Sequence, residues 1–215
     1  AGCLSEPLPA SPSEPWSNPF LRPGAAVRIQ IDYVEGRMPS AYATDGLLDV
    51  MADVGTPASI EMRATLPPRG APYTSPAIIA IHQATYTGVP DTWRDAEGIP
   101  LLHVLFLDAN YTKEEVRGIA LNGYPLIAIF PDQLSNLPLF KASARVPASL
   151  PEGFERSILV HEYGHVLGLV GCGLPELELR ENATDRCHST QDTSVMLPYL
   201  HQSSDLRTWA LDDER

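Results

Sequence analysis

The chain has 215 residues, with 15 Lys and Arg against 27 Asp and Glu, a net charge of −12 and a pI near 4.8. Such a charge repels phosphate backbones, so we expect no nucleic-acid partner. No apolar run reaches the roughly 18 residues that a membrane-spanning helix needs. With 44% hydrophobic residues the composition predicts one globular domain of ordinary type, which we expect to be a monomer.

The first 24 residues differ in composition from the rest. Between Leu4 and Gly24 there are six prolines among Ser and Glu, which predicts an extended tether over 1–24 ahead of a catalytic domain over 25–215. The opening "AGC" resembles the end of a bacterial lipobox, so one interpretation is a lipid anchor on Cys3. That interpretation predicts an exported protein, periplasmic, extracellular or held at the cell surface as a lipoprotein. The alternative is a frayed terminus with an incidental cysteine.

Hydrophobic periodicity predicts eight elements after the tether. Thr44 is the expected N-cap of the first helix and Gly55 its stop, while Ser75 and Pro76 are the expected cap and first-turn pair of the second helix. In chain order we expect a strand over 27–33, a helix over 44–54, a strand over 58–65, a helix over 76–86, a buried strand over 101–108, two strands within 117–130 around a turn at 122–123, and a helix over 151–170. This order predicts an α/β (α+β) domain with one mixed, mostly parallel twisted sheet and a loop-rich C-terminal part.

The last predicted helix carries the sequence "HEYGH". Residues four apart lie on one face of a helix, so His161 and His165 can hold one metal ion. Glu162 lies beside that face, where its carboxylate can act as general base on a metal-activated water. The predicted cofactor is zinc, and the predicted reaction is hydrolysis of peptide bonds in a polypeptide substrate.

Gly168 and Met196 extend this motif, and with them the chain resembles the metzincin clan of zinc peptidases. The resemblance covers about residues 27 to 200 and is specific only at 161–168. It implies that the glycine lets the chain leave the active-site helix with positive φ, and that Met196 forms a hydrophobic floor beneath the metal. It also implies that the 117–125 segment is an edge strand able to pair with an extended peptide. The chain is similar as well to a group of predicted bacterial lipoprotein metalloproteases.

Gly171 departs from the metzincin pattern, because it occupies the place of the usual third ligand. In an exported protein Cys172 and Cys187 are expected to form a disulfide, which brings His188 next to this empty position, and we therefore expect His188 as the third ligand. Glu181 is an alternative, since "ENATD" resembles the glutamate-bearing segment of gluzincin peptidases, and Asp185 is another. In a reducing compartment the two cysteines could bind zinc as thiolates instead.

Three further residues have an ordinary structural interpretation beside a functional one. Tyr199 follows Met196 by three residues and is a candidate for oxyanion stabilisation, with a core aromatic as the alternative. His82 and His103 lie in apolar surroundings and are expected to be hydrogen-bonded core histidines rather than ligands. The expected function is therefore a zinc metalloendopeptidase, and the alternative of a different class is a metal- or peptide-binding module that has lost turnover.

Overall fold

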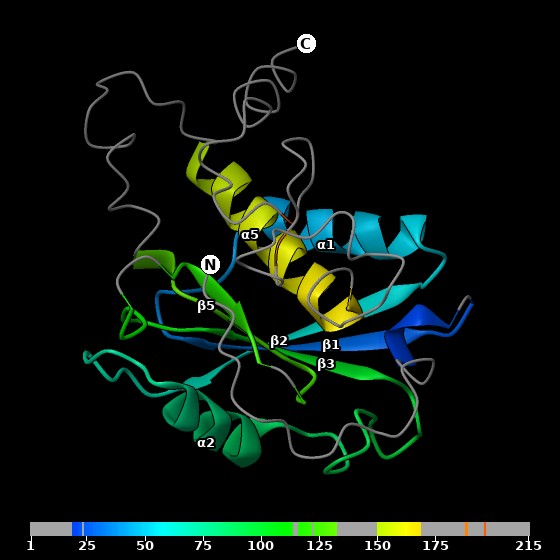
Figure 1. The fold of residues 1–215 in the computed structure, drawn as a ribbon, viewed down its shortest axis with the longest axis horizontal. Helices are drawn as coiled ribbons and strands as arrows, with labels where there is room; N and C mark the ends of the chain where they lie inside the picture. Colours follow the sequence, from blue (N-terminus) through cyan, green and yellow to red (C-terminus); the bar gives the residue numbers. More distant parts are fainter. Residues whose placement is uncertain are drawn as a thin grey trace.

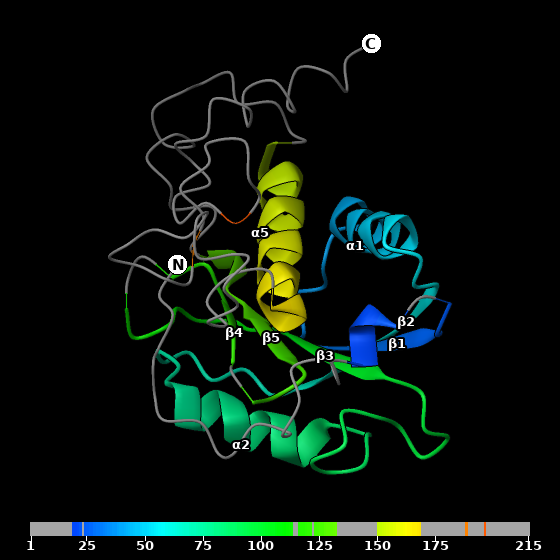
Figure 2. The same ribbon diagram turned by 45° about the vertical axis from the view of Figure 1, so that its right-hand side comes forward.

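The structure is a computed structural model, and it describes residues 19–22, 24–113, 116–121, 123–132, 150–168, His188 and Met196. In this part of the chain a central sheet separates two helical layers (Figure 1). Helices α1 (Ala41–Asp53) and α5 (Leu150–Leu167) cover one face, and helix α2 (Ser75–Thr85) covers the other (Figure 2). None of the helices in the described ranges combines the length and the apolar character needed to cross a bilayer.

The sheet has five strands in the order β2-β1-β3-β5-β4. The strands are β1 Val27–Val34, β2 Ala58–Leu66, β3 Leu101–Phe106, β4 Gly118–Ala120 and β5 Leu126–Ile129. Strands β1, β2, β3 and β5 run parallel, whereas β4 pairs antiparallel with β5. Both β3 and β5 are fully buried, as expected for strands covered on both faces by helices. The predicted α/β fold with a mixed, mostly parallel sheet is confirmed.

Helix α1 begins earlier than predicted. Its N-cap is Ser40, whose hydroxyl accepts a hydrogen bond from the Ala43 backbone N–H at 3.2 Å. The expected cap, Thr44, instead lies in the first turn and donates its hydroxyl proton to the Ala41 carbonyl at 2.9 Å. The prediction of Thr44 as N-cap was therefore wrong. Ser and Thr side chains can bond backbone groups both at an N-cap and inside a helix, so the residue type alone did not distinguish Ser40 from Thr44. The helix stops near Gly55 as predicted, with φ +76° at that residue.

The other two helices fall close to their expected positions. Helix α2 is capped by Thr74, one residue before the predicted Ser75, and the Ser75 hydroxyl bonds the Tyr111 hydroxyl at 2.8 Å. Helix α5 begins at Leu150, near the predicted start, and ends before Gly168, which has φ +76°. The positive φ at Gly168 that the metzincin resemblance implied is present.

Each face of the sheet has its own hydrophobic core. Under α1 and α5 the core includes Leu47, Leu159 and Tyr163, and on the side of α2 it includes Ile78 and Leu105. The short 3-10 turn η2 (Pro19–Leu21) joins the first core, because Phe20 is fully buried there and stacks on Trp93 with ring centroids 6.1 Å apart. The folded part of the chain thus reaches back into the segment 1–24.

Candidate metal centre

Helix α5 is the scaffold of the predicted site. Ile158, Leu159 and Tyr163 are buried in the core, so the side of the helix that bears them is held against the sheet and the rotation of the helix is fixed. His161 and His165 then project from consecutive turns with ring centroids 4.8 Å apart. The helix supplies two candidate ligands whose mutual geometry follows from the spacing of four residues.

His188 completes a group of three imidazoles with these two. Its ring centroid lies 5.3 Å from that of His161 and 5.3 Å from that of His165, and its side chain is fully buried. One nitrogen from each ring lies within 4.8 Å of the other two. In the part of the chain that the structure describes, this is the one group of three or more His, Cys, Asp or Glu side chains with such convergence.

The separation of the nitrogens can be compared with a zinc site. Two ligands bound tetrahedrally at about 2.05 Å lie roughly 3.3 Å apart. The Nε2 atoms of His161 and His165 are 3.1 Å apart, which fits this edge. The three ligand nitrogens lie within 4.8 Å of one another, which is a looser limit than this edge, so binding of one ion would draw His188 toward the helix pair.

The protonation state also suits a metal. Burial, together with the neighbouring rings of His161 and His188, lowers the pKa of His165 to about 2. A neutral imidazole keeps a nitrogen lone pair, which is the form that coordinates a metal ion. The residues present therefore fit a divalent ion that accepts nitrogen ligands, and zinc is the ion that three histidines most commonly hold.

Glu162 lies next to this group and is almost fully enclosed, with 3% of its surface exposed. Burial raises the pKa of Glu162 to about 7, while a hydrogen bond from the backbone N–H of Ala120 acts in the opposite direction. Ala120 belongs to strand β4, so the carboxyl group is held against the antiparallel edge of the described sheet. A carboxyl group with such a pKa can both accept and release a proton near neutral pH.

Gly118 controls how closely α5 approaches β4, and no sequence motif marked it as a site residue. A Cβ atom at Gly118 would lie 2.7 Å from Ile158 Cγ2 and 2.8 Å from Glu162 Cγ. Real side-chain contacts are not this short, so the close approach requires glycine. The signal in the sequence was a glycine at the start of a short apolar strand, which by itself does not tell what approaches it.

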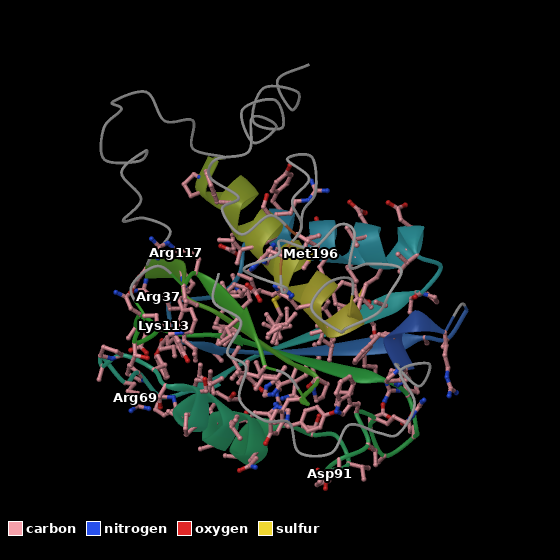
Figure 3. All side chains as sticks on the ribbon, viewed as in Figure 1. Arg37, Arg69, Asp91, Lys113, Arg117 and Met196 are labelled. Atoms are coloured by element: carbon pink, nitrogen blue, oxygen red, sulfur yellow. The ribbon has the colours of Figure 1, made fainter. Side chains whose placement is uncertain are left out.

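The remaining predicted site residues divide into two groups. Met196 is buried with 3% exposure, and its side chain is labelled beside α5 in Figure 3. The other candidates lie outside the described residues: Cys3, Gly171, Cys172, Glu181, Asp185, Cys187 and Tyr199. The expected disulfide and the alternative ligands consequently stay predictions.

His82 on α2 and His103 on β3 lie on the other face of the sheet from α5. Both are buried, and their Nδ1 atoms are 2.8 Å apart. The expectation of hydrogen-bonded core histidines is confirmed for both.

Comparisons with protein-family models, with curated proteins and with solved structures found no match to this chain. What can be said of its function comes from its own residues and their geometry.

Proposed function

We propose that this chain is a zinc-dependent endopeptidase of metzincin type, with His161, His165 and His188 as ligands and Glu162 as general base. One observation carries the proposal: three imidazoles from two separate segments converge, and Glu162, whose side chain is buried, adjoins His161 on the same helix. His188 follows His165 by 23 residues and still stacks beside His161. If the two helix histidines had only a structural role, no third imidazole would be needed there.

When bound, zinc supplies a Lewis acid that lowers the pKa of water toward neutrality and polarises a carbonyl group. The chain supplies the proton transfers. The Glu162 carboxylate takes a proton from the attacking water, holds it on a carboxylate oxygen, and releases it to the leaving amine. Only 3% of the Glu162 surface is exposed, which would limit the access of bulk water to that proton.

Strand β4 offers a surface for the substrate. It is the last strand at its side of the described sheet and runs antiparallel to β5. We propose that an extended peptide pairs with this edge, which would place its carbonyl groups near Glu162, because Glu162 already bonds to the β4 backbone. The positive φ of Gly168 and the burial of Met196 support the metzincin assignment over the gluzincin alternative, which gives these two residues no role.

The test combines metal content with hydrolysis of an unfolded protein such as casein. Purified full chain is expected to contain about one zinc per molecule and to cleave casein. Glu162→Gln keeps the size of the side chain but cannot accept the proton, so it should retain zinc and lose cleavage. Gly153→Ala is the matched control on the same helix, since a Cβ at Gly153 meets nothing within 4 Å.

The outcomes separate the alternatives. Cleavage that survives Glu162→Gln would overturn the role of Glu162. Zinc in the wild-type chain without cleavage of any unfolded substrate would favour a metal-binding module. Full zinc occupancy in His188→Ala would overturn the assignment of His188 and return Glu181 and Asp185 to consideration.

A further inference from the structure

A second group of buried histidines lies between the sheet and α2, and it involves none of the proposed zinc ligands. His82 Nδ1 lies 2.8 Å from His103 Nδ1, and His103 Nε2 lies 2.8 Å from Asp32 Oδ2. The three residues come from α2, β3 and β1, and all are buried. They form one continuous chain of hydrogen bonds from the helix into the centre of the sheet.

The positions of the protons follow from the acid at one end. Asp32 accepts from Arg63 through Nε at 2.9 Å and through Nη2 at 2.7 Å, so it is an ionised acceptor. His103 must therefore donate to Asp32 through Nε2–H, which leaves its Nδ1 as an acceptor. His82 then donates through Nδ1–H, and its Nε2 is the ring nitrogen of the chain that has no proton and no hydrogen-bond partner among the described residues.

The surroundings oppose an added positive charge. Asp32 on β1 is already paired with Arg63 on β2, and the nearest polar groups are neutral: Gln30 and Thr65, which both donate to Asp32. The tyrosine rings of Tyr86 and Tyr124 face His82, with centroids 4.5 and 5.7 Å from it. Within the described ranges, neither imidazole has a hydrogen bond to a carboxylate other than Asp32.

Burial lowers the pKa values of both imidazoles. Burial first, and the neighbouring His103 second, lower the pKa of His82 to about 3. Burial also lowers the pKa of His103, although Asp32 acts against this. In an unfolded chain both would titrate near 6.5, so the unfolded chain binds more protons than the folded chain below that pH.

Few contacts attach α2 to the strands. His82 bonds His103 with 2.8 Å between their Nδ1 atoms. At the end of the helix, the Thr85 carbonyl accepts from Gln30 Nε2 at 3.0 Å and from Arg63 Nη2 at 2.8 Å. The backbone of α5 approaches β4 and β5 closely, whereas α2 has no comparable approach to a strand. The buried residues of α2 are Ser75, Ile78 and His82, and of these His82 is the one hydrogen-bonded to a strand residue.

We propose that the chain His82–His103–Asp32 is a proton-operated latch, which holds α2 on the sheet at neutral pH and releases it in mild acid. One proton from solvent adds to His82 Nε2 and forms a buried imidazolium. A second proton at His103 Nδ1 turns the acceptor of the Nδ1–Nδ1 contact into a donor, so two N–H groups face each other and the contact breaks. The sign is a loss of stability as pH falls below about 6.5. The ratio of attached to released α2 should fall about tenfold per pH unit and per proton.

The experiment measures hydrogen-exchange protection of the α2 amides in the full chain at pH 7 and pH 5, corrected for the intrinsic exchange rate. Protection in wild type is expected to fall by about 30-fold for one proton and up to about 1000-fold for two. His82→Asn keeps an N–H donor toward His103 Nδ1 but cannot be protonated, so its ratio between the two pH values should be smaller by about 30-fold.

Ile78→Val is the matched control on α2. It removes one methylene from a fully buried side chain, so it should lower protection by a similar factor at both pH values and leave their ratio unchanged. Equal ratios in wild type and His82→Asn would overturn the latch.

Should His82→Asn fail to fold, nitrogen chemical shifts of the wild-type imidazoles give an independent answer. The expected state at pH 7 is a proton on Nδ1 of His82 and on Nε2 of His103. The opposite tautomer of His103, or a doubly protonated ring, would also overturn the proposal. Neither measurement depends on zinc or on peptide cleavage, so the latch can fail or succeed apart from the proposed function.

Discussion

The two faces of the sheet each bury histidines, but they use the ring nitrogens in different ways. On the face of α5, nitrogens of His161, His165 and His188 point toward a common region within 4.8 Å of one another. On the face of α2, His103 has a defined partner for each nitrogen, Asp32 on one side and His82 on the other. Nitrogens that converge on one point keep lone pairs for a metal ion. In a row of hydrogen bonds, the lone pair of His103 accepts a hydrogen bond from its neighbour instead.

Neither burial nor a lowered pKa separates these two kinds of histidine. His165 and His82 are both largely buried, and both have a pKa far below the usual value of 6.5. The two kinds of histidine differ in where the neighbouring nitrogen and oxygen atoms lie: around one common point beside His165, or in a row from His82 to Asp32. A metal-binding role should therefore be argued from the convergence of ligand atoms rather than from a perturbed titration.

The largest effect that tests this comparison is on metal affinity. His161→Ala removes a converging nitrogen and should weaken zinc binding by more than the 10–100-fold that loss of a supporting partner costs. His82→Asn removes a histidine from the other face and should leave zinc affinity unchanged. Competition with a chromogenic chelator measures both, and equal losses in the two variants would mean that the faces do not differ as described.

The next effect is on stability at neutral pH. Asp32→Asn removes the buried carboxylate that pairs with Arg63, whose own side chain is 24% exposed. This should lower the free energy of unfolding by about 2–4 kcal/mol, somewhat less than the loss of a partner from a fully buried pair. Arg37→Gln is the control, because the Arg37–Asp132 pair is partly exposed and should cost under about 1 kcal/mol. Urea unfolding at pH 7 distinguishes them, and a similar small loss in both would show that the α2 face is not stabilised by this ion pair.

A third effect appears in acid. Burial alone raises the pKa of Asp32, but hydrogen bonds from His103, Arg63 and Thr65 outweigh burial and hold the pKa below its usual range. A depressed carboxyl pKa stabilises the fold above the unfolded value of 3.8, and that contribution is lost as pH falls below it. Wild type should lose about 1.4 kcal/mol per pH unit from this group below pH 4. In Asp32→Asn this contribution to the loss of stability between pH 4 and pH 2 should be absent. Urea unfolding midpoints of the two proteins over that pH range measure the difference.

The smallest effect concerns the close approach on the α5 face. Gly118→Ala places a methyl group against Ile158 and Glu162, which should cost about 1–3 kcal/mol and lower casein cleavage by moving the carboxylate. Gly153→Ala on α5 has open space and should be neutral or stabilising by up to about 1 kcal/mol. Unchanged cleavage and stability in Gly118→Ala would mean that the contact between α5 and β4 does not position Glu162.

Local patterns predicted most of the described fold. Alternation in β1, the continuous apolar run of β3 and the glycine after α1 are signals contained in a few neighbouring residues. The spacing of four between His161 and His165 is local in the same sense. The N-cap of α1 was missed because Ser40 and Thr44 are both suitable residues, and the sequence does not show which backbone carbonyl is already in the helix.

The parts that sequence could not predict are contacts between distant residues. Asp32 lies 71 residues from His103, and nothing near either residue indicates that the register of β1 and β3 puts them together. The contact of Gly118 with α5 depends in the same way on where the helix crosses β4. The proposed ligand His188 was reached from the sequence only through an expected disulfide between Cys172 and Cys187, which lies outside the described residues.

The presence of His161, Glu162 and His165 on one helix has a mechanical consequence. A rigid shift of α5 carries all three together and leaves their mutual distances unchanged, so the pair of ligands and the base are insensitive to small motions of the scaffold. His188 belongs to a different segment, and its distance to the helix is the one that such motions alter. A bound ion would then cross-link α5 to the segment that carries His188. Removal of the ion by a chelator should weaken the attachment of that segment while α5 itself stays folded.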